Sequence, residues 1–419
     1  MKKNKVILVC LLFFTFIDLS KAIELTLKEC INLAFENNPA LKSKLAELES
    51  AKYSYYSSLN SYLPKINLSN NFSRSGGDNN QTSNTFSLSA SVSQNIFDYD
   101  SIYTIKSSRI NYEIAQLNYE SYLIDLRKNI YTAFYNLLFA QETYRVNEKI
   151  VEIRKNNADL IKLKYQSGFE SKGNMLYAVA QYEMARLNLD KSKRQIEIAS
   201  NNLKNAIGIK IKDEILVREN ISMPQILFER DKIIDYIKST PAYKIFEKNI
   251  LLAEEKLKTN KYDWLPKLSF SASRGYSGKS EFPDTNMTWS IGLGLSFPLF
   301  SSGITYYKNN VDMLKETLRS TREKLNAYII SAENDIQNAY NEYLNSVSTV
   351  KTYAILLEAN EERYKEAQIK YMAGKMSYID LENIEQNLVD SRQNYTEYIK
   401  NVYLRKISLE SLIGEKISQ

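Results

Sequence analysis

Apolar and polar residues alternate along the segment 86–97, FSLSASVSQNIF. One parity is almost entirely apolar, and the other is serine or asparagine up to the final Phe97. Because successive side chains of a strand point to opposite faces, this alternation predicts a strand with one apolar and one hydroxyl-rich face. Further strand segments are expected at 65–72, 267–277 and 288–300, joined into pairs by polar loops at 73–84 and 278–286, and serine or glycine alternates with apolar residues in three of the four segments. We therefore expect two β-hairpins, 65–97 and 267–300.

The rest of the chain reads as helix. No glycine or proline occurs at 98–166, 304–373 or 375–413. Such runs predict helices much longer than those of a compact domain, and a helix of about 69 residues would measure roughly 100 Å. The chain is therefore expected to project outward or to bridge a distance of this order.

Apolar residues of the first long helix recur every seven positions in two seams. Two seams favour a helix with neighbours on both sides, as in a ring of helices, whereas a two-stranded coiled coil needs only one seam. A wide core-facing stripe in a bundle remains the alternative. The seams consist of Ile110, Leu117, Ile124, Tyr131 and Leu138, and of Ile105, Tyr112, Tyr119, Leu126, Ala133 and Ala140.

The sequence contains the same unit twice. YLPKINLS at 62–69 returns as WLPKLSFS at 264–271, and YQSGFES at 165–171 returns as YMAGKMS at 371–377. A repeat of this length indicates two copies of one structural unit. We predict a first repeat at 23–214, a linker at 215–224 and a second repeat at 225–419.

The N-terminus has the features of a secretory signal. Three lysines precede an apolar run at 6–17, and a small-x-small ending at 20–22 predicts cleavage after Ala22, so that 1–22 is a signal peptide. The run is short for a membrane span, and no later segment is apolar over 18 residues, so no transmembrane helix is expected.

The amino-acid composition limits the kinds of catalytic and metal site that the chain can form. Histidine is absent, and cleavage would leave Cys30 as the single cysteine, which argues against imidazole catalysis, most zinc sites and a disulfide. Lysine and arginine number 55 against 49 acids, but the charges are interspersed along helices. They are interpreted as solvated faces and not as a nucleic-acid surface. No enzyme activity and no cofactor are predicted.

The strand pattern is typical of a membrane β-barrel, with apolar residues toward lipid and small polar residues toward a wet lumen. A soluble half-buried sheet alternates in the same way. Four strands cannot close a barrel, and open edges are not tolerated in lipid, so a membrane barrel would be shared between chains. Aromatic residues near strand ends are candidates for contacts at the membrane interface: Tyr62, Phe97, Trp264, Trp289 and Phe300.

The doubled Leu-Pro-Lys elements at Leu63 and Leu265, the Tyr-x-x-Gly turns at Tyr165 and Tyr371, and LSFPLFSSG at 295–303 together resemble the TolC family of outer membrane efflux proteins. The resemblance covers essentially the whole mature chain. It implies a mainly α fold with a small β part, in which long antiparallel helices of a homotrimer form an α-helical barrel that continues a 12-stranded β-barrel. It also implies a passive exit duct in the outer membrane of a Gram-negative bacterium, embedded in outer membrane lipid.

The resemblance further implies partners, namely a periplasmic adaptor protein and an inner-membrane transporter of an efflux or type I secretion system. The cargo and the particular pump stay open. The alternative function is a secreted structural coiled-coil protein without a pore, whose short sheets form a soluble cap.

In this family the two helix turns at the periplasmic tip form the gate. Asp380 falls on an acidic gate position, whereas Asn174 and Asn383 stand where relatives can have Asp, and Met376 stands where they can have Arg. Ser377-x-x-Asp380 is also a capping signature, so Asp380 is interpreted either as a helix cap alone or as a gate residue. The expected gate residues are Tyr165, Gly168, Asn174, Tyr371, Gly374, Asp380 and Asn383.

Overall fold

The computed structural model describes residues 23–78, 80–226, 228–278, 287–299 and 302–414. The chain divides into two compact units. One comprises Met1–Asn38, Ile130–Met223 and Val350–Lys400, and the other comprises Pro39–Asn129, Pro224–Thr349 and Asn401–Gln419. The predicted signal peptide lies outside the described residues.

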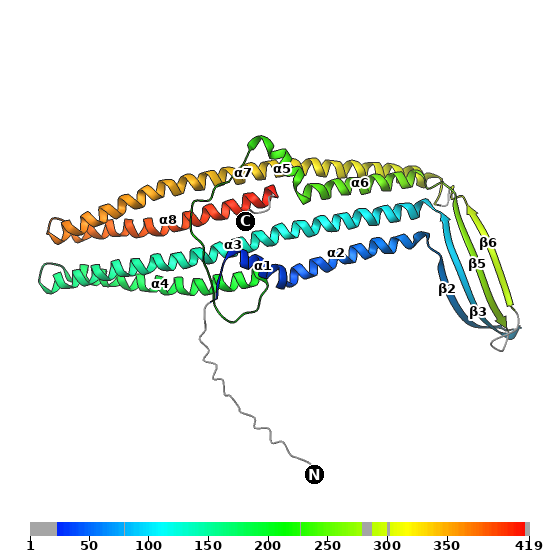
Figure 1. Ribbon diagram of the computed structural model, residues 1–419, viewed down its shortest axis with the longest axis horizontal. Coiled ribbons are helices and arrows are strands. Elements are labelled where there is room, and N and C mark those ends of the chain that lie inside the picture. Colours follow the sequence, from blue (N-terminus) through cyan, green and yellow to red (C-terminus); the bar gives the residue numbers. More distant parts are fainter. Residues whose placement is uncertain (1–22, 79, 227, 279–286, 300–301, 415–419) are drawn as a thin grey trace, which may run out of the picture. The chain divides into compact units, whose positions relative to one another are not determined.

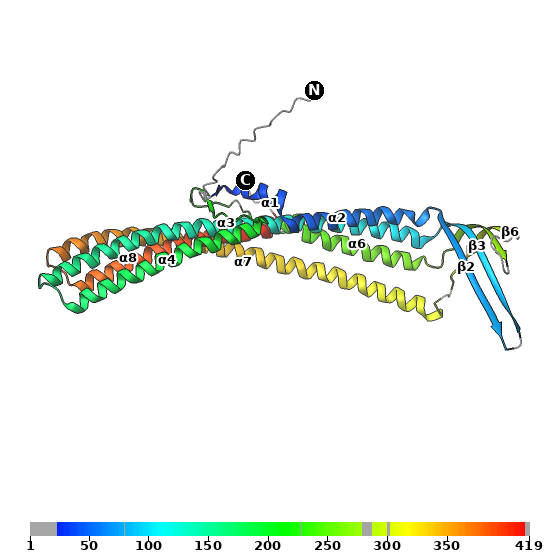
Figure 2. The same ribbon diagram turned by 90° about the horizontal axis from the view of Figure 1, so that it is seen from below.

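Three long helices contribute to both units, namely α3 (Tyr99–Gln166), α7 (Ile304–Met372) and α8 (Tyr378–Ile413). The first unit also contains α1 (Leu27–Asn37) and α4 (Lys172–Ile207). The views in Figures 1 and 2 show the α3–α4 and α7–α8 hairpins of this unit running side by side. The predicted long helices are confirmed, and their bounds follow the runs without glycine or proline.

Large apolar side chains of α3 form much of the core of the first unit, with Ile130, Phe134 and Leu137 fully buried. A short parallel pair of strands, β1 (Ile23–Leu25) and β4 (Ile215–Val217), lies in the same unit. Three-residue strands give too little alternation to be seen in the sequence, so this pair was not predicted.

The second unit combines helices with a sheet. Its elements are α2 (Pro39–Ser58), η1 (Leu59–Tyr62), β2 (Lys65–Gly77), β3 (Asn80–Phe97), η2 (Arg230–Lys232), α5 (Ile233–Ser239), α6 (Pro241–Lys261), β5 (Lys267–Gly278) and β6 (Met287–Ser296), with parts of the three long helices. Its helical core contains Ile237, Ile336 and Leu409, each almost fully buried.

The sheet is antiparallel with strand order β2-β3-β5-β6 (Figure 1). Residues paired across neighbouring strands share a face, so the register sorts the side chains. One face carries Leu68, Ala90, Ala272 and Ile291 and is mainly apolar, although Asn70 and Arg274 share it. The opposite face is rich in serine and glycine. Hydroxyl groups bond across the strands on that second face, for example Ser273 Oγ to Ser290 Oγ at 2.8 Å.

The four predicted strands are confirmed, but the loop prediction for 73–84 is wrong for most of its length. β2 continues to Gly77 and β3 begins at Asn80, because backbone pairing continues through polar residues such as Ser73 and Thr85. The strand predicted at 288–300 ends at Ser296. Among the described residues, none of the helices is at once long enough and apolar enough to cross a membrane.

Two glycines on the serine-rich face provide a matched test of the sheet. A Cβ at Gly275 would meet the Leu88 carbonyl oxygen at 3.1 Å and the Ser89 Cβ at 3.2 Å, whereas a Cβ at Gly292 would have only Ser271 Oγ nearby, at 3.7 Å. We expect Gly275→Ala to lower the free energy of unfolding by about 1–3 kcal/mol, because the crowded backbone must shift. Gly292→Ala should change it much less. Thermal unfolding in detergent, followed by circular dichroism, measures the difference, and equal stability of the two variants would contradict the observed strand packing.

Candidate functional site

The candidate site is the pair of turns that connect α3 to α4 and α7 to α8. Gly168 and Gly374 have φ values of 78° and 69°, in the left-handed region that favours glycine. The amide of the next residue reaches back five positions in each turn, from Phe169 to the Lys164 carbonyl at 2.8 Å and from Lys375 to the Lys370 carbonyl at 2.9 Å. Both helices therefore end in the same glycine-dependent motif.

Each following helix begins with a serine cap. Ser171 Oγ accepts a hydrogen bond from the Asn174 backbone amide at 3.1 Å. Ser377 Oγ accepts one from the Asp380 amide at 3.2 Å and donates one to Asp380 Oδ2 at 2.6 Å. The capping interpretation of Asp380 therefore has direct support, while its carboxylate stays exposed to solvent.

The two tyrosines of the repeated turns have different environments. The Tyr371 side chain is 3% exposed, and its hydroxyl donates a hydrogen bond to Glu170 Oε2 at 2.8 Å. Lys164 Nζ lies 3.7 Å from the centre of the Tyr371 ring and donates to the Tyr371 carbonyl oxygen at 2.9 Å. Tyr165, its counterpart, is 37% exposed. The tip contacts of Tyr371 thus join the turn of one hairpin to the turn of the other.

Glu170 is the centre of these contacts. Besides Tyr371, it accepts hydrogen bonds from the Ser171 amide at 3.0 Å and from Asn174 Nδ2 at 2.7 Å. Burial acts to raise the pKa of Glu170, but these three bonds and nearby Lys164 outweigh it and hold the pKa below its ordinary value. The carboxylate is therefore charged under ordinary conditions and anchors the turn.

The structure joins only some of the expected gate residues. Tyr371 and Asn174 meet through Glu170, whereas Asn383 is exposed. Met376 packs against the apolar core of the tip. Sequence reasoning missed Glu170 and Lys164, although Glu170 lies inside the repeated motif at 165–171 and Lys164 directly precedes it.

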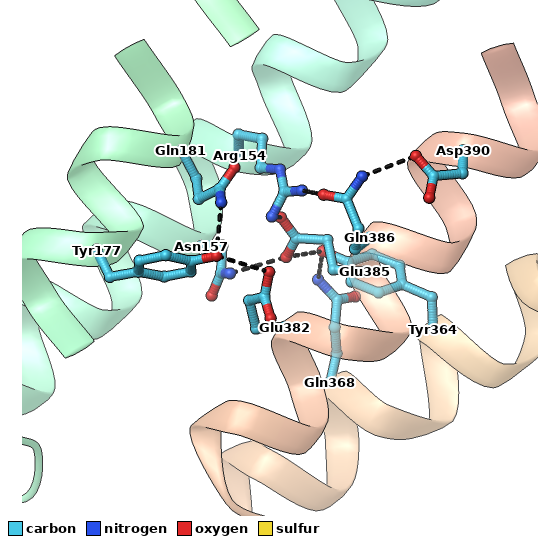
Figure 3. Close-up of polar contacts among 10 residues, drawn as sticks. All are labelled: Arg154, Asn157, Tyr177, Gln181, Tyr364, Gln368, Glu382, Glu385, Gln386 and Asp390. Carbon is cyan, nitrogen blue, oxygen red and sulfur yellow. Dashed lines mark hydrogen bonds and ion pairs between the residues drawn. The ribbon is translucent and has the colours of Figure 1, made fainter. Parts of the chain in front are cut away.

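Farther from the turns, a buried polar network joins the same two hairpins (Figure 3). Arg154 Nη1 of α3 lies 2.8 Å from Glu385 Oε1 of α8, and their side chains are 4% and 0% exposed. Asn157 Nδ2 donates to Glu385 Oε2 at 2.8 Å, and the Tyr364 hydroxyl lies 3.5 Å from that oxygen. Arg154 also donates to Gln386 Oε1.

The interpretation of helical charges as solvated faces is wrong for this pair. Arg154 and Glu385 face inward, because the neighbouring positions of four helices form an apolar core around them. Arg154 and Glu385 lie more than 200 positions apart in the chain, so a single sequence could not reveal that they pair. The core consists of Ala158, Ile161, Ala178, Tyr364, Ala367, Tyr371, Tyr378, Leu381 and Leu388. In the described part of the chain, no group of three or more acidic or cysteine side chains is placed to hold a metal ion.

The expected interface aromatics lie at or near the sheet. Trp289 on β6 is 70% exposed, Trp264 before β5 is exposed, and Phe97 ends β3. The Tyr62 hydroxyl donates to the Asp98 carbonyl oxygen at 2.9 Å and so ties the start of β2 to the end of β3. Phe300 lies outside the described residues.

The contrast between the two tyrosines yields a test of the tip contacts. Tyr371→Phe removes the hydroxyl donor of Glu170 and should destabilise the turn locally by about 1–3 kcal/mol, because a charged acceptor loses one partner. Amide hydrogen exchange of 165–174 should become several-fold faster. The control Tyr165→Phe alters an exposed hydroxyl and should leave exchange unchanged, and equal rates in both variants would exclude the Tyr371–Glu170 bond as an anchor.

Comparisons with known proteins identify relatives of this chain. The chain is 22% identical to the outer membrane protein TolC of Escherichia coli K12, over 99% of this chain and 87% of TolC. Its fold matches the crystal structure of CusC with a TM-score of 0.81 at 16% identity, covering 92% and 91% of the two chains. It also matches the CmeC outer membrane channel of Campylobacter jejuni with a TM-score of 0.78 at 18% identity, covering 94% and 87%. The family model described as "Outer membrane efflux protein" matches residues 30–209 and 243–415, and the chain therefore belongs to the outer membrane efflux protein family.

Proposed function

We propose that three copies of this chain form an outer membrane duct whose β-barrel is assembled from all three sheets. The observation that carries the proposal is the sheet itself. Leu68 on β2 and Leu293 on β6 are 72% and 71% exposed on its apolar face, which extends over all four strands and is interrupted by polar side chains such as Asn70 and Arg274. A surface of this kind is expected to be covered by lipid, and the serine-rich face would line a water-filled lumen.

The edges of the sheet require further strands. Within the described residues, β2 pairs only with β3, and β6 pairs only with β5. Unpaired backbone amides and carbonyls are very costly in lipid, so each β2 edge would pair with the β6 edge of a neighbouring chain. Three chains of four strands supply 12 strands (3 × 4), an even number within the range of bacterial outer membrane barrels.

The helical hairpins would lie on the periplasmic side and end at the gate. We propose that the turns at Gly168 and Gly374 surround the entrance and face a periplasmic adaptor protein and an inner-membrane transporter. The duct would be passive, since the transporter supplies the energy. A cleaved signal peptide at 1–22 would direct export to the outer membrane of a Gram-negative bacterium.

Asp380 is proposed as the charged residue of this entrance in addition to its capping role. Its carboxylate is exposed at the first turn of α8, beside the glycine turn. Three copies around a threefold axis would place like charges together and attract cations. The other expected tip positions, Asn174 and Asn383, are neutral and would contribute no charge.

The oligomer is tested by placing a charge on either face of the sheet. We expect the mature chain, extracted from outer membranes in mild detergent, to run as a trimer in native mass spectrometry. Ile291→Lys places a charge on the apolar face and should greatly reduce trimer yield, because a lysine there costs about 2–4 kcal/mol at the membrane midplane. The neighbouring variant Ser290→Lys points to the opposite face and should still give trimers. Monomers of the unaltered chain, recovered only from the soluble periplasm, would favour a secreted structural coiled-coil protein.

The role of Asp380 is tested with two variants. One removes the charge of Asp380, and the other removes the Ser377 hydroxyl that caps the helix. Asp380→Asn should weaken block by divalent cations added on the periplasmic side, by roughly tenfold in blocking concentration, because the ring of charge is lost. Ser377→Ala removes the cap hydroxyl but keeps the carboxylate and should leave block nearly unchanged. Single-channel recording measures both, and unchanged block in Asp380→Asn would reduce this residue to a helix cap.

A further inference from the structure

The buried pair of Arg154 and Glu385 connects the α3–α4 hairpin to the α7–α8 hairpin. Arg154 belongs to α3 of the first hairpin, and Glu385 belongs to α8 of the second (Figure 3). Asn157 of α3 adds a second bond to the same carboxylate. If the hairpins part, these contacts must break and water must reach both charges.

Other polar contacts cross the same boundary, but neither of the two described next joins two buried side chains. The Tyr177 hydroxyl of α4 lies 3.4 Å from Glu382 Oε1 of α8, at an exposed site. Gln393 Nε2 of α8 donates to Asn147 Oδ1 of α3 at 3.2 Å. The Arg154–Glu385 pair differs because it is enclosed by the apolar core of the tip.

The pair is not arranged for maximal stability. The 2.8 Å contact between Arg154 Nη1 and Glu385 Oε1 lacks the alignment of a hydrogen bond, so both atoms have none within the described residues. The buried Asn157 Oδ1 and Tyr378 hydroxyl also have no hydrogen-bond partner there. Buried ion pairs contribute little net stability compared with apolar side chains, and unmade bonds add to the cost. Stability alone therefore gives a poor account of this network.

We propose that the buried Arg154–Glu385 pair is a proton-sensitive latch, which holds the two tip hairpins together more firmly when Glu385 is protonated than when it is ionised. The role of this latch in opening the channel rests on the proposed function of the turns as a gate. The latch itself is a property of one chain.

Protonation favours the joined hairpins because the surroundings of the Glu385 carboxyl group differ between the joined and the parted state. Burial raises the pKa of Glu385 to about 7 from an ordinary value of 4.5, although Arg154 acts in the opposite direction. Nearby Glu382 adds to the rise. Burial also raises the pKa of the phenols of Tyr364 and Tyr378, so neither titrates near neutral pH. The groups that face Glu385 are Arg154 and Asn157 from α3, Tyr364 from α7, and Tyr378 and Glu382 from α8, with Tyr177 of α4 bonded to Glu382.

Parted hairpins would expose Glu385 to water and return its pKa to the ordinary value. The joined state therefore binds the proton more tightly than the parted state. Its stabilisation by protonation is complete below pH 4.5 and is lost as pH rises through about 7. Between pH 5.5 and 8, a fall in pKa from about 7 to 4.5 on parting would increase the ratio of parted to joined hairpins by up to roughly thirtyfold.

Spin-label distances within one chain test the latch directly. Labels at Ser167→Cys and Ala373→Cys occupy exposed positions in the two turns, and the native Cys30 is buried. Labelled chain is diluted into an excess of unlabelled chain, so that only distances within one chain are counted. We expect a population with longer distances to grow several-fold or more between pH 5.5 and 8.

Three variants separate titration of Glu385 from a merely structural role. Glu385→Gln resembles the protonated carboxyl group in shape and charge and should keep the short distance at both pH values. Glu382→Gln, the matched control, removes a neighbouring carboxylate and should retain the pH response with a somewhat lower midpoint. Arg154→Gln leaves Glu385 without a cation and should move the midpoint to higher pH. If that variant does not fold, the comparison of Glu385→Gln with Glu382→Gln still decides the question.

A pH response that persists in Glu385→Gln, or an unaltered chain whose distances do not change with pH, would overturn the latch. Channel recordings on the same proteins separate this outcome from failure of the proposed function. Absence of current steps at every pH would refute the duct while the distance measurement still tests the latch. Current steps with an open probability that rises with pH in the unaltered chain, but not in Glu385→Gln, would link the latch to the gate.

Discussion

The proposed assembly of this protein depends on the need to pair the backbone groups at the edges of its sheet. One chain supplies four strands with a mainly apolar face, and among the described residues β2 and β6 are each paired on one side only. Such a sheet is unfavourable in either solvent, because exposing the apolar face to water and leaving the edge backbone groups unpaired in lipid both cost free energy. Closure with further copies satisfies both demands. The serine and glycine residues of the opposite face, packed closely at Gly275, then fit the inside of a narrow barrel.

The helical hairpins meet a different constraint at their ends. If the turns form the proposed gate, their contacts must be specific without being very strong. Glycine turns and serine caps define the ends of the helices, and the Tyr371–Glu170 bond joins the two turns. Deeper in the tip, Arg154 and Glu385 place charge in an apolar core, where the cost of ionisation couples hairpin contact to protonation.

The family, the fold class and the function as an efflux channel were predicted correctly from sequence because they depend on local pattern and order. Alternation predicted β3, and the absence of glycine and proline predicted α3 and α7. The membership of the outer membrane efflux protein family also supports a passive channel and not an enzyme. The tip contacts were harder to foresee, because Arg154 and Glu385 look like any charged residues on a long helix. Only their burial in the structure and the contact of Tyr364 with Glu385 show that they face inward. The repeat boundaries and the gate role of Asp380 remain predictions.

Planar-bilayer recording of the purified mature chain tests the central claim most directly. A trimeric duct with a closed β-barrel predicts discrete current steps that last for seconds, with insertion in one orientation when protein is added to one side. Protein that is shown to be folded and inserted in the bilayer, but never produces such steps under any condition of pH or salt, would contradict the account.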